Sequence, residues 1–262
     1  MTGEWSFDGR SAIVTGAGSG IGKAVTLALA AAGAKVVAVD IDGDAAKATA
    51  DEAIANEATA SVVPHRADVA DRAQVFGYVE AATAEHGAPV LFFNNAGVEG
   101  VHKSIVDTDP ADWLRVIDVN LNSMFWGLQA VLPHMKAQGA GAVVNTGSIL
   151  SLKSAPDRSD YAVTKHAVLG LTRSAASEMA AHGVRINCLC PGPIETPLMR
   201  RSEMLVNPDD PDWERRRFEE GTPIGRYTST REIAETVLFL LRGDVAYQTG
   251  SAVVIDGGIT SV

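Results

Sequence analysis

The stretch Ala12-Ile-Val-Thr-Gly-Ala-Gly-Ser-Gly-Ile-Gly22 decides the fold. It begins with apolar residues that can form a buried strand, and its glycines lead into the Ala-rich run Lys23-Ala-Val-Thr-Leu-Ala-Leu-Ala-Ala-Ala-Gly33, which has a helical composition. Glycines permit a tight turn that a phosphate can approach, and the N-terminus of a helix supplies amide donors and a positive dipole. The stretch therefore predicts a strand, a phosphate-binding loop and a helix, in the order typical of dinucleotide-binding folds.

The spacing of the glycines differs from two other phosphate-binding patterns. Gly16-x-x-x-Gly20-x-Gly22 departs from Gly-x-Gly-x-x-Gly because Ile21 occupies the place of the third glycine. A P-loop would need a glycine at Ala17 and a hydroxyl at Ala24, so the magnesium ligand of an ATPase is missing. A glycine-rich turn alone fits phosphate binding and a purely structural turn equally well, and the residues further along the chain favour the first.

Apolar runs of strand length alternate with stretches of helical length along the whole chain. The predicted strands lie near 12–14, 35–39, 61–63, 90–93, 142–144, 184–189 and 252–255, and the predicted helices near 21–32, 43–57, 71–86, 111–137, 160–181 and 231–242. Strands that are apolar throughout are covered by helices on both faces. We therefore predict an α/β fold in which residues 1–262 form a single-domain, Rossmann-type doubly wound parallel sheet of about seven strands.

Composition excludes several classes of partner. Lys and Arg minus Asp and Glu give 22 − 32 = −10, and a negative field repels nucleic acid and anionic lipid. The first ten residues lack the apolar core of a signal peptide, and no window reaches the roughly 18 apolar residues of a membrane span, so we expect a cytoplasmic protein. Cys188 and Cys190 are expected to be small core residues without a disulfide, and the six scattered histidines predict no metal site.

Residues 193–228 form the longest stretch without a clear hydrophobic period, and they are rich in Pro, Arg and Glu. A connection of that length inside a compact domain is usually functional. We predict that this segment is a lid over a substrate. The alternative is a solvated insertion that only packs on a neighbouring element.

Asp40 ends the second predicted strand, 18 residues beyond Gly22. A carboxylate at this place in a dinucleotide fold accepts hydrogen bonds from the adenosine ribose and would repel a 2′-phosphate. Together with Ser19, which stands in the glycine loop where a basic residue would favour NADP, Asp40 predicts NAD as the cofactor and makes NADP the weaker choice. The alternative is that Asp40 only caps a turn before Gly43.

Tyr161-Ala-Val-Thr-Lys165 places a phenol and an ammonium one turn apart on a predicted helix. The pKa of a free tyrosine is near 10, and a nearby cation lowers it by stabilising the phenolate. Bringing that pKa to about 7 takes about 4 kcal/mol of differential stabilisation. A Tyr-x-x-x-Lys pair alone is more often a surface pair. Ser148, however, follows an apolar strand and is expected at the sheet edge where open α/β folds bind ligands.

The order of several motifs along the chain carries a family resemblance. In sequence order they are Thr15-Gly-x-x-x-Gly-x-Gly22, Asn94-Asn-Ala-Gly97, Asn120, Ser148, Tyr161-x-x-x-Lys165 and Pro191-Gly192. This set, which spans roughly residues 8–258, resembles the short-chain dehydrogenase/reductase family, including its usual 13-residue step from Ser148 to Tyr161. A divergent enoyl reductase would space the tyrosine and the lysine further apart, so the resemblance is to the branch that acts on alcohols and ketones.

The resemblance implies a role for each matching residue. Tyr161 would be the general acid/base and Ser148 would hydrogen-bond the reacting oxygen. Lys165 would bind the nicotinamide ribose and lower the tyrosine pKa, while Asn120 would hold a water in the proton relay. Gly147 stands where many members have a second serine, which is expected to loosen that turn. The residues implied to bind the cofactor are Gly16, Ser19, Gly20, Ile21, Gly22, Asp40, Ile41, Asp68, Val69, Asn95, Ala96, Gly97, Tyr161, Lys165, Pro191, Gly192, Ile194 and Thr196.

We therefore predict an NAD(H)-dependent oxidoreductase that interconverts a secondary alcohol and a ketone, with a non-ionic, partly hydrophobic substrate such as a cyclic ketone or a steroid-like ring. Residues expected near the substrate are Val98, Leu150, Leu152, Leu198, Met199 and, in the lid, Trp213. The resemblance also implies a homotetramer built on the helices that carry Asn120 and Tyr161. Two alternatives stay open. One is an NADPH-dependent 3-ketoacyl-type reductase with a basic docking patch. The other is a non-catalytic dinucleotide-binding regulator, which would bind NADH without turnover.

Overall fold

Seven parallel strands form one sheet in the computed structural model, which describes residues 6–57, 59–243 and 246–261. Their order across the sheet is β3-β2-β1-β4-β5-β6-β7, so the direction of strand addition reverses between β1 and β4. This order confirms the predicted doubly wound, Rossmann-type sheet. The strands are β1 (Ser11–Thr15), β2 (Lys35–Asp40), β3 (Ser61–Arg66), β4 (Leu91–Asn94), β5 (Gly141–Thr146), β6 (Val184–Pro191) and β7 (Ala252–Ile255).

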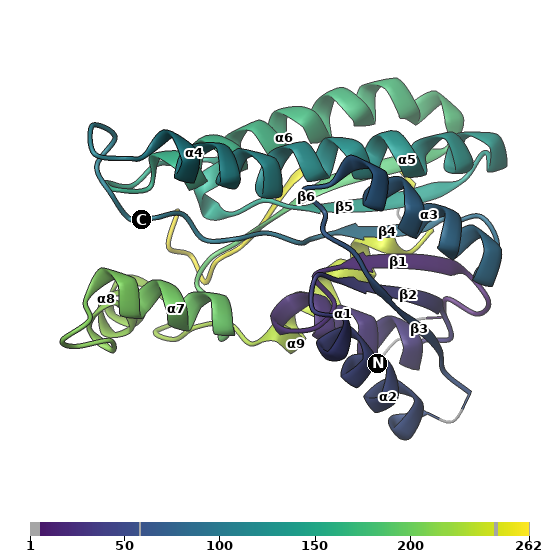
Figure 1. Ribbon diagram of the computed structural model, residues 1–262, viewed down its shortest axis with the longest axis horizontal. Helices are drawn as coiled ribbons and strands as arrows, with labels where there is room; N and C mark the ends of the chain where they lie inside the picture. The colour runs from purple at the N-terminus through teal and green to yellow at the C-terminus, as the bar shows by residue number, and fades with distance from the viewer. Residues whose placement is uncertain (1–5, 58, 244–245, 262) are drawn as a thin grey trace.

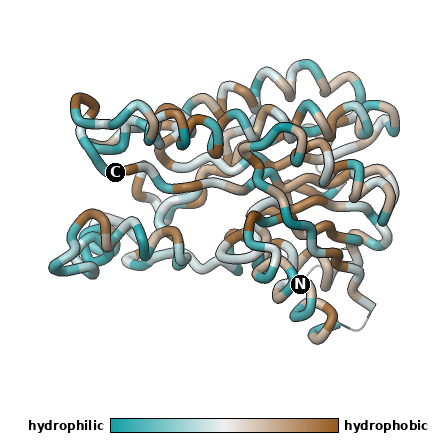
Figure 2. Tube along the Cα trace, viewed as in Figure 1, coloured by the Kyte–Doolittle hydropathy of each residue, from teal (hydrophilic) through white to brown (hydrophobic). Residues whose placement is uncertain are grey.

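Helices cover both faces of this sheet (Figure 1). Val36 of β2 packs with Leu29 on one face, and the next residue, Val37, packs with Val75 on the other. Successive side chains of a strand point to opposite faces, so a strand between two helical layers is apolar throughout. Figure 2 shows the hydrophobic residues along the strands, between these layers. The layers contain α1 (Gly20–Ala31), α2 (Gly43–Asn56) and α9 (Thr230–Leu241) on one face, and α3 (Arg72–His86), α5 (Ser123–Gln138) and α6 (Ser159–Met179) on the other.

Side-chain caps mark the starts of several helices. Aspartate side chains accept hydrogen bonds from first-turn amides in α2, α3 and α4 (Pro110–Ile117), at Asp42, Asp71 and Asp109. Ser229 and Glu232 form a capping box at the start of α9. In α1 the N-cap residue Ser19 makes no such bond, so the first-turn amides of α1 keep their donors for an external anion.

The long helix predicted over 111–137 is interrupted. Its two ends are α4 and α5, and a π-helical turn, η1 (Asp118–Asn122), joins them. A π-helical turn widens the backbone locally and is frequent at functional sites. Here the turn contains Asn120, whose side chain is completely buried.

The segment 193–228 contains two short helices that the sequence pattern did not indicate, α7 (Pro197–Val206) and α8 (Trp213–Gly221). They lie apart from the sheet in Figure 1, beyond the carboxyl ends of the strands. Both ends of the segment are tied together by a parallel bridge between Ile194 and Thr228, where Glu195 N donates to Thr228 O at 3.0 Å and Thr228 N donates to Pro193 O at 3.1 Å. The segment therefore forms a closed loop that leaves the sheet and returns to it at the same place.

Two further expectations concern single features. Cys188 and Cys190 are free thiols and completely buried in β6, with their sulfurs 3.8 Å apart, which confirms them as small core residues. Across the described ranges, none of the helices is long and apolar enough to cross a membrane. Residues 1–5, half of the stretch that lacks a signal-peptide core, lie outside the described residues.

Candidate active site

A cavity of about 1110 Å³ opens at the carboxyl ends of the strands. Its wall combines the glycine loop after β1, the ends of β2, β4, β5 and β6, and the inner sides of α7 and α8. It includes the place where the strand order reverses, and open α/β sheets bind their ligands there. A cavity of this size exceeds that of a typical single small-molecule site, so it has room for an extended ligand beside a second, smaller one.

The cavity wall brings together most of the residues predicted to bind a cofactor. They are Gly16, Ser19, Gly20, Ile21, Asp40, Ile41, Asp68, Val69, Asn95, Ala96, Gly97, Tyr161, Lys165, Pro191, Gly192, Ile194 and Thr196. Gly22 lies behind the loop and does not line the cavity, and neither does the buried Asn120. The residues expected near a substrate that line it are Val98, Leu150, Leu198, Met199 and Trp213. The expectation for Leu152 is wrong, because this side chain is 44% exposed outside the cavity.

The glycine loop folds back on itself. A Cβ atom on Gly22 would lie 1.9 Å from the carbonyl oxygen of Gly16, and Gly16 itself has a φ of +69°. Only glycine allows both this contact and this backbone conformation. The fold-back places the uncapped start of α1 against the cavity, and these residues fit a pyrophosphate held by backbone amides.

Asp40 sits at the end of β2 with both carboxylate oxygens in use. Oδ2 accepts from Gly18 N at 2.8 Å and Oδ1 accepts from Asp42 N at 3.0 Å. The carboxylate therefore does hold the turn before α2, as the structural alternative expected. Each carboxylate oxygen accepts more than one hydrogen bond, so the carboxylate retains capacity toward the cavity that it lines.

Asn95 joins three strands below the cavity. Its Nδ2 donates to Thr15 O at 2.9 Å, and its Oδ1 accepts from Thr146 Oγ1 at 3.1 Å. The Asn95 and Ala96 amides both donate to Thr15 Oγ1. Buried polar groups need such partners, and here they fix the loop after β4 to the ends of β1 and β5.

The side chain of Asn120 holds the same loop from the other side. Its Oδ1 accepts from Val98 N at 2.8 Å and its Nδ2 donates to Val98 O at 2.9 Å. This pair of bonds fixes the backbone of Val98, whose side chain is part of the cavity wall. In the structure Asn120 is thus a positioning residue, and the role in a proton relay that the resemblance implies remains a prediction.

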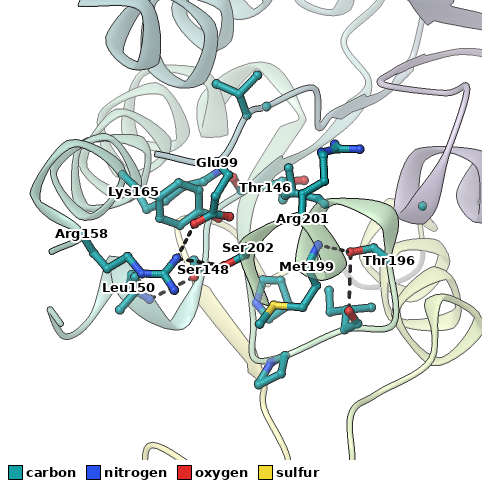
Figure 3. A pocket seen from close by; sticks show the side chains of 18 of the residues that line it. Glu99, Thr146, Ser148, Leu150, Arg158, Lys165, Thr196, Met199, Arg201 and Ser202 are labelled. Carbon is teal, nitrogen blue, oxygen red and sulfur yellow. Dashed lines mark hydrogen bonds and ion pairs between the residues drawn. The ribbon is translucent and has the colours of Figure 1, made fainter. Parts of the chain in front are cut away.

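Ser148 follows β5 and opens the single turn η2 (Ile149–Ser151). Its Oγ accepts from Leu150 N at 3.1 Å, and Ser151 Oγ accepts from Ser148 N at 3.1 Å. This capping box holds the Ser148 hydroxyl in a fixed place on the cavity wall. Figure 3 shows the bond between Ser148 and Leu150 at the base of the cavity.

Tyr161 and Lys165 lie one turn apart in α6, as predicted, and both line the cavity. Lys165 Nζ is 5.3 Å from the centre of the Tyr161 ring and donates to Thr146 O at 2.8 Å. The ammonium thus faces the ring and a carbonyl oxygen. Burial lowers the pKa of Lys165 to about 8, because a desolvated ammonium is disfavoured.

The pKa of Tyr161 differs from the sequence-based expectation. Burial raises it well above the usual value and the negative charge of Glu99 raises it further, while a hydrogen bond with Ser148 and the charge of Arg158 lower it. The pKa is therefore raised overall, whereas we expected from the sequence that a nearby cation would lower it; the lowering by Lys165 stays a prediction. Desolvation of the phenolate outweighs the favourable charges.

Comparison with known proteins identifies the family. A family model described as enoyl-(acyl carrier protein) reductase matches residues 16–260. Levodione reductase of Leifsonia aquatica is 40% identical over 252 residues, which cover 96% of this chain and 94% of that protein. The chain belongs to the short-chain dehydrogenase/reductase family.

Members of the short-chain dehydrogenase/reductase family match this chain in length and in fold. Cyclohexanol dehydrogenase of Acinetobacter sp. (strain SE19) is 40% identical over 255 residues, covering 97% of this chain and 96% of that protein. The crystal structure of levodione reductase matches with a TM-score of 0.96 at 39% sequence identity, covering 98% of this chain and 99% of the other. These relatives confirm the resemblance seen in the motifs, and they show that the chain is an oxidoreductase of this family.

Gly147 is a departure from many family members, and the structure explains it. A Cβ atom at Gly147 would lie 2.6 Å from Cys188 Sγ and 2.7 Å from Ser151 Oγ. The space of a second serine is therefore filled by neighbouring side chains. The expectation of a loosened turn is wrong, because Gly147 packs closely and its amide donates to Leu189 O at 2.7 Å.

This family member also has a polar cluster in the cavity wall that the sequence analysis missed. Arg158 bonds to Glu99 and, at 2.9 Å, to Glu214 Oε1, and His102 Nε2 lies 3.1 Å from Glu99 Oε1. Arg158 also donates to Ser202 Oγ of α7 at 3.3 Å, so the cluster joins the segment 193–228 to the loops around Tyr161. In Figure 3 dashed lines join the Arg158 guanidinium to Glu99 and to Ser202. These residues share no local sequence pattern that could have identified them. The one signal nearby is that Glu99 lies two positions after the Asn94-Asn-Ala-Gly97 motif.

Proposed function

We propose that this oxidoreductase transfers a hydride between NAD(H) and a small secondary alcohol or ketone. The observation that carries the proposal is one continuous cavity with two ends. Ser148, Tyr161 and Lys165 line one end, and Asp40 and the glycine loop line the other. Residues that can bind a dinucleotide and residues that can move a proton thus share one cavity.

Each side chain has a distinct task in this proposal. When bound, the nicotinamide ring supplies or accepts the hydride. Tyr161 gives a proton to the carbonyl oxygen during reduction and takes it from the hydroxyl during oxidation. Because the pKa of Tyr161 is raised, its hydroxyl is protonated at neutral pH and ready to donate. Ser148 hydrogen-bonds the reacting oxygen and stabilises its developing charge, and Lys165 binds the ribose beside it.

The apolar part of the wall supports a non-ionic substrate with a hydrophobic ring. Val98, Leu150, Leu198 and Met199 line the cavity together with Trp213 of α8. Two relatives are named for levodione and cyclohexanol, which makes a cyclic alcohol or ketone the first choice. In this proposal the segment 193–228 is the lid over that substrate. Turnover with only charged sugars or acyl thioesters in a kinetic screen would overturn this assignment.

Assembly and location are part of the same proposal. Exposed apolar side chains on α4, α5 and α6, at Leu114, Phe125 and Val163, support a homotetramer that buries these helices. The two free thiols of β6 support a reducing, cytoplasmic location.

The choice of NAD over NADP rests on Asp40 and leads to a direct test. We expect fluorescence titrations of the purified protein to give tighter binding of NADH than of NADPH. Asp40→Ala should weaken NADH binding by roughly 10- to 100-fold, the worth of hydrogen bonds to a charged group. Asp44→Ala is the matched control, because Asp44 is a nearby exposed aspartate outside the cavity wall, and it should change NADH binding little.

Other outcomes of these titrations favour the alternatives. Tighter NADPH binding by the unchanged protein would favour the 3-ketoacyl-type reductase. Tight NADH binding without turnover of any alcohol or ketone would favour the non-catalytic regulator.

A further inference from the structure

The carboxylate of Glu99 is held in a fixed place beside the proton-transfer residues. Its neighbour Val98 is bonded through both backbone groups to Asn120. On the other side, Val101 N donates to Asp160 Oδ2 at 3.0 Å, and a Cβ atom on Gly100 would lie 2.3 Å from Asp160 Oδ1. The loop is thus pressed against the start of α6, which carries Tyr161. Glu99 is close enough for its charge to act on both Tyr161 and Lys165.

Only one oxygen of this carboxylate has a protein partner. Within the described part of the chain, the bonds from Arg158 and His102 both go to Glu99 Oε1, and no hydrogen bond reaches Oε2. Glu99 Oε2 is not among the buried polar atoms that lack a partner, whereas Glu214 Oε2, on the other side of Arg158, is one of them. Because Glu99 lines the cavity, its second oxygen remains accessible from inside the cavity.

The pairing of Glu99 with Arg158 and His102 accounts for one of its oxygens and leaves Oε2 for a ligand. A carboxylate oxygen accepts hydrogen bonds and cannot donate one when ionised. The Arg158 bond on Oε1 fixes the orientation of the carboxylate in the cavity wall, as Figure 3 shows. A carboxylate oxygen without a protein partner favours a ligand with an O–H donor and disfavours one without it.

We propose that Glu99 Oε2 binds a second hydroxyl group of the substrate, so that the preferred substrates are diols or hydroxy ketones rather than simple alcohols. This inference rests on the proposed function, because it assigns the substrate class of the same cavity. The second hydroxyl lies on a carbon close to the reacting one, since Glu99 and Tyr161 act on the same end of the cavity. Glu99 is here a specificity-determining residue, and the proton transfer itself stays with Tyr161.

A comparison of three substrates tests the proposal with NAD as the acceptor. Cyclohexanol has the reacting hydroxyl alone, cyclohexane-1,2-diol adds the second donor, and 2-methoxycyclohexanol adds the oxygen without the donor. We expect kcat/KM for the diol to exceed both other values by roughly 10- to 100-fold, the range for a hydrogen bond to a charged group. Equal values for the diol and the methoxy compound would overturn the proposal.

Variants at Glu99 separate recognition from structure. Glu99→Gln should bring the ratio of kcat/KM for the diol to kcat/KM for cyclohexanol close to one. Glu99→Asp should do the same, because its shorter side chain keeps the charge but moves the carboxylate oxygen away from the substrate. Glu214→Gln is the matched control, because it removes a carboxylate from the same Arg158, and it should retain the ratio of the unchanged protein. Loss of the ratio in Glu214→Gln as well would show that only the integrity of the cluster matters and would overturn the proposal.

The rate with cyclohexanol shows whether a negative result contradicts the role of Glu99 or the proposed function itself. Absence of NAD-linked turnover of all three substrates would contradict the proposed function itself. Turnover of cyclohexanol without a preference for the diol would contradict only the role of Glu99. NADH titration of each variant shows that the cofactor end of the cavity is still folded.

The charge of Glu99 also predicts a change in the pH profile of cyclohexanol oxidation. Burial raises the pKa of Tyr161 most and the charge of Glu99 raises it further, while a hydrogen bond with Ser148 and the charge of Arg158 lower it; Lys165 faces the same ring. Oxidation needs the deprotonated tyrosine, so its rate rises with pH through that pKa. Removing the negative charge in Glu99→Gln should move this rise to lower pH, while Glu214→Gln should leave it in place. An unchanged profile in Glu99→Gln would show that its charge does not act on Tyr161.

Discussion

Replacing Tyr161 with phenylalanine is expected to lower kcat by roughly 10²- to 10⁴-fold in both directions, the usual worth of a positioned acid or base. The ring of Tyr161 packs beside Lys165 and remains in the variant, so the fold of the cavity should persist. Only the phenolic oxygen is lost, and it is the atom that gives and takes the proton in the proposal. The measurement is the steady-state rate with NAD and cyclohexanol and with NADH and cyclohexanone.

Two controls show whether this loss reflects proton transfer. Tyr161→Phe should bind NADH as the unchanged protein does, because the dinucleotide is held mainly by the glycine loop and Asp40 in the proposal. Tyr78→Phe makes the same chemical change at a fully buried tyrosine of α3 outside the cavity, and it should retain activity. Activity of Tyr161→Phe near that of Tyr78→Phe would contradict the role of Tyr161 and favour a different proton donor.

The second large effect is expected for Ser148→Ala, which should lower kcat by roughly 10²- to 10³-fold, as removal of one oxyanion-stabilising donor does. The substitution also removes the cap on Leu150 N, which costs about 1 kcal/mol of stability. Both effects come from one hydroxyl, so the loss of rate alone does not separate them. A thermal melt measured beside the rate gives the structural part.

Ser151→Ala provides the matched control for this substitution. Ser151 supplies the other half of the same capping box by accepting from Ser148 N, but it does not line the cavity. We expect a similar loss of stability with most of the activity retained. If Ser151→Ala lost as much activity as Ser148→Ala, the serine would act through the turn rather than on the reacting oxygen.

The sheet could be predicted from the sequence because its signal is repeated along the chain. Residues such as Val36 and Val37 are apolar in succession since each faces a different helical layer, and this pattern recurs in strand after strand. The two helices of the segment 193–228 were not predicted. α8 is largely hydrophilic along its trace in Figure 2, so no apolar period marked it.

The placement of Tyr161 and Lys165 side by side in the cavity wall could be predicted, because their spacing along one helix is a local property. The polar cluster around Arg158 could not, because Glu99 and Glu214 meet it from positions 59 and 56 residues away. The pKa of Tyr161 was predicted in the wrong direction for a related reason. The sequence shows the charge of Lys165 nearby, whereas the degree of burial depends on the whole fold.

The bridge between Ile194 and Thr228 separates the sheet from the insertion that carries α7 and α8 in the cavity wall. Its two hydrogen bonds involve only backbone atoms, so they place few demands on the sequence between them. Lengthening a closed loop is also inexpensive, since each doubling of its length costs only about 0.6 kcal/mol. This insertion can therefore be replaced or lengthened at low cost while the sheet and Tyr161 stay where they are. The part of the cavity wall formed by α7 and α8 can in this way change its shape independently of the sheet.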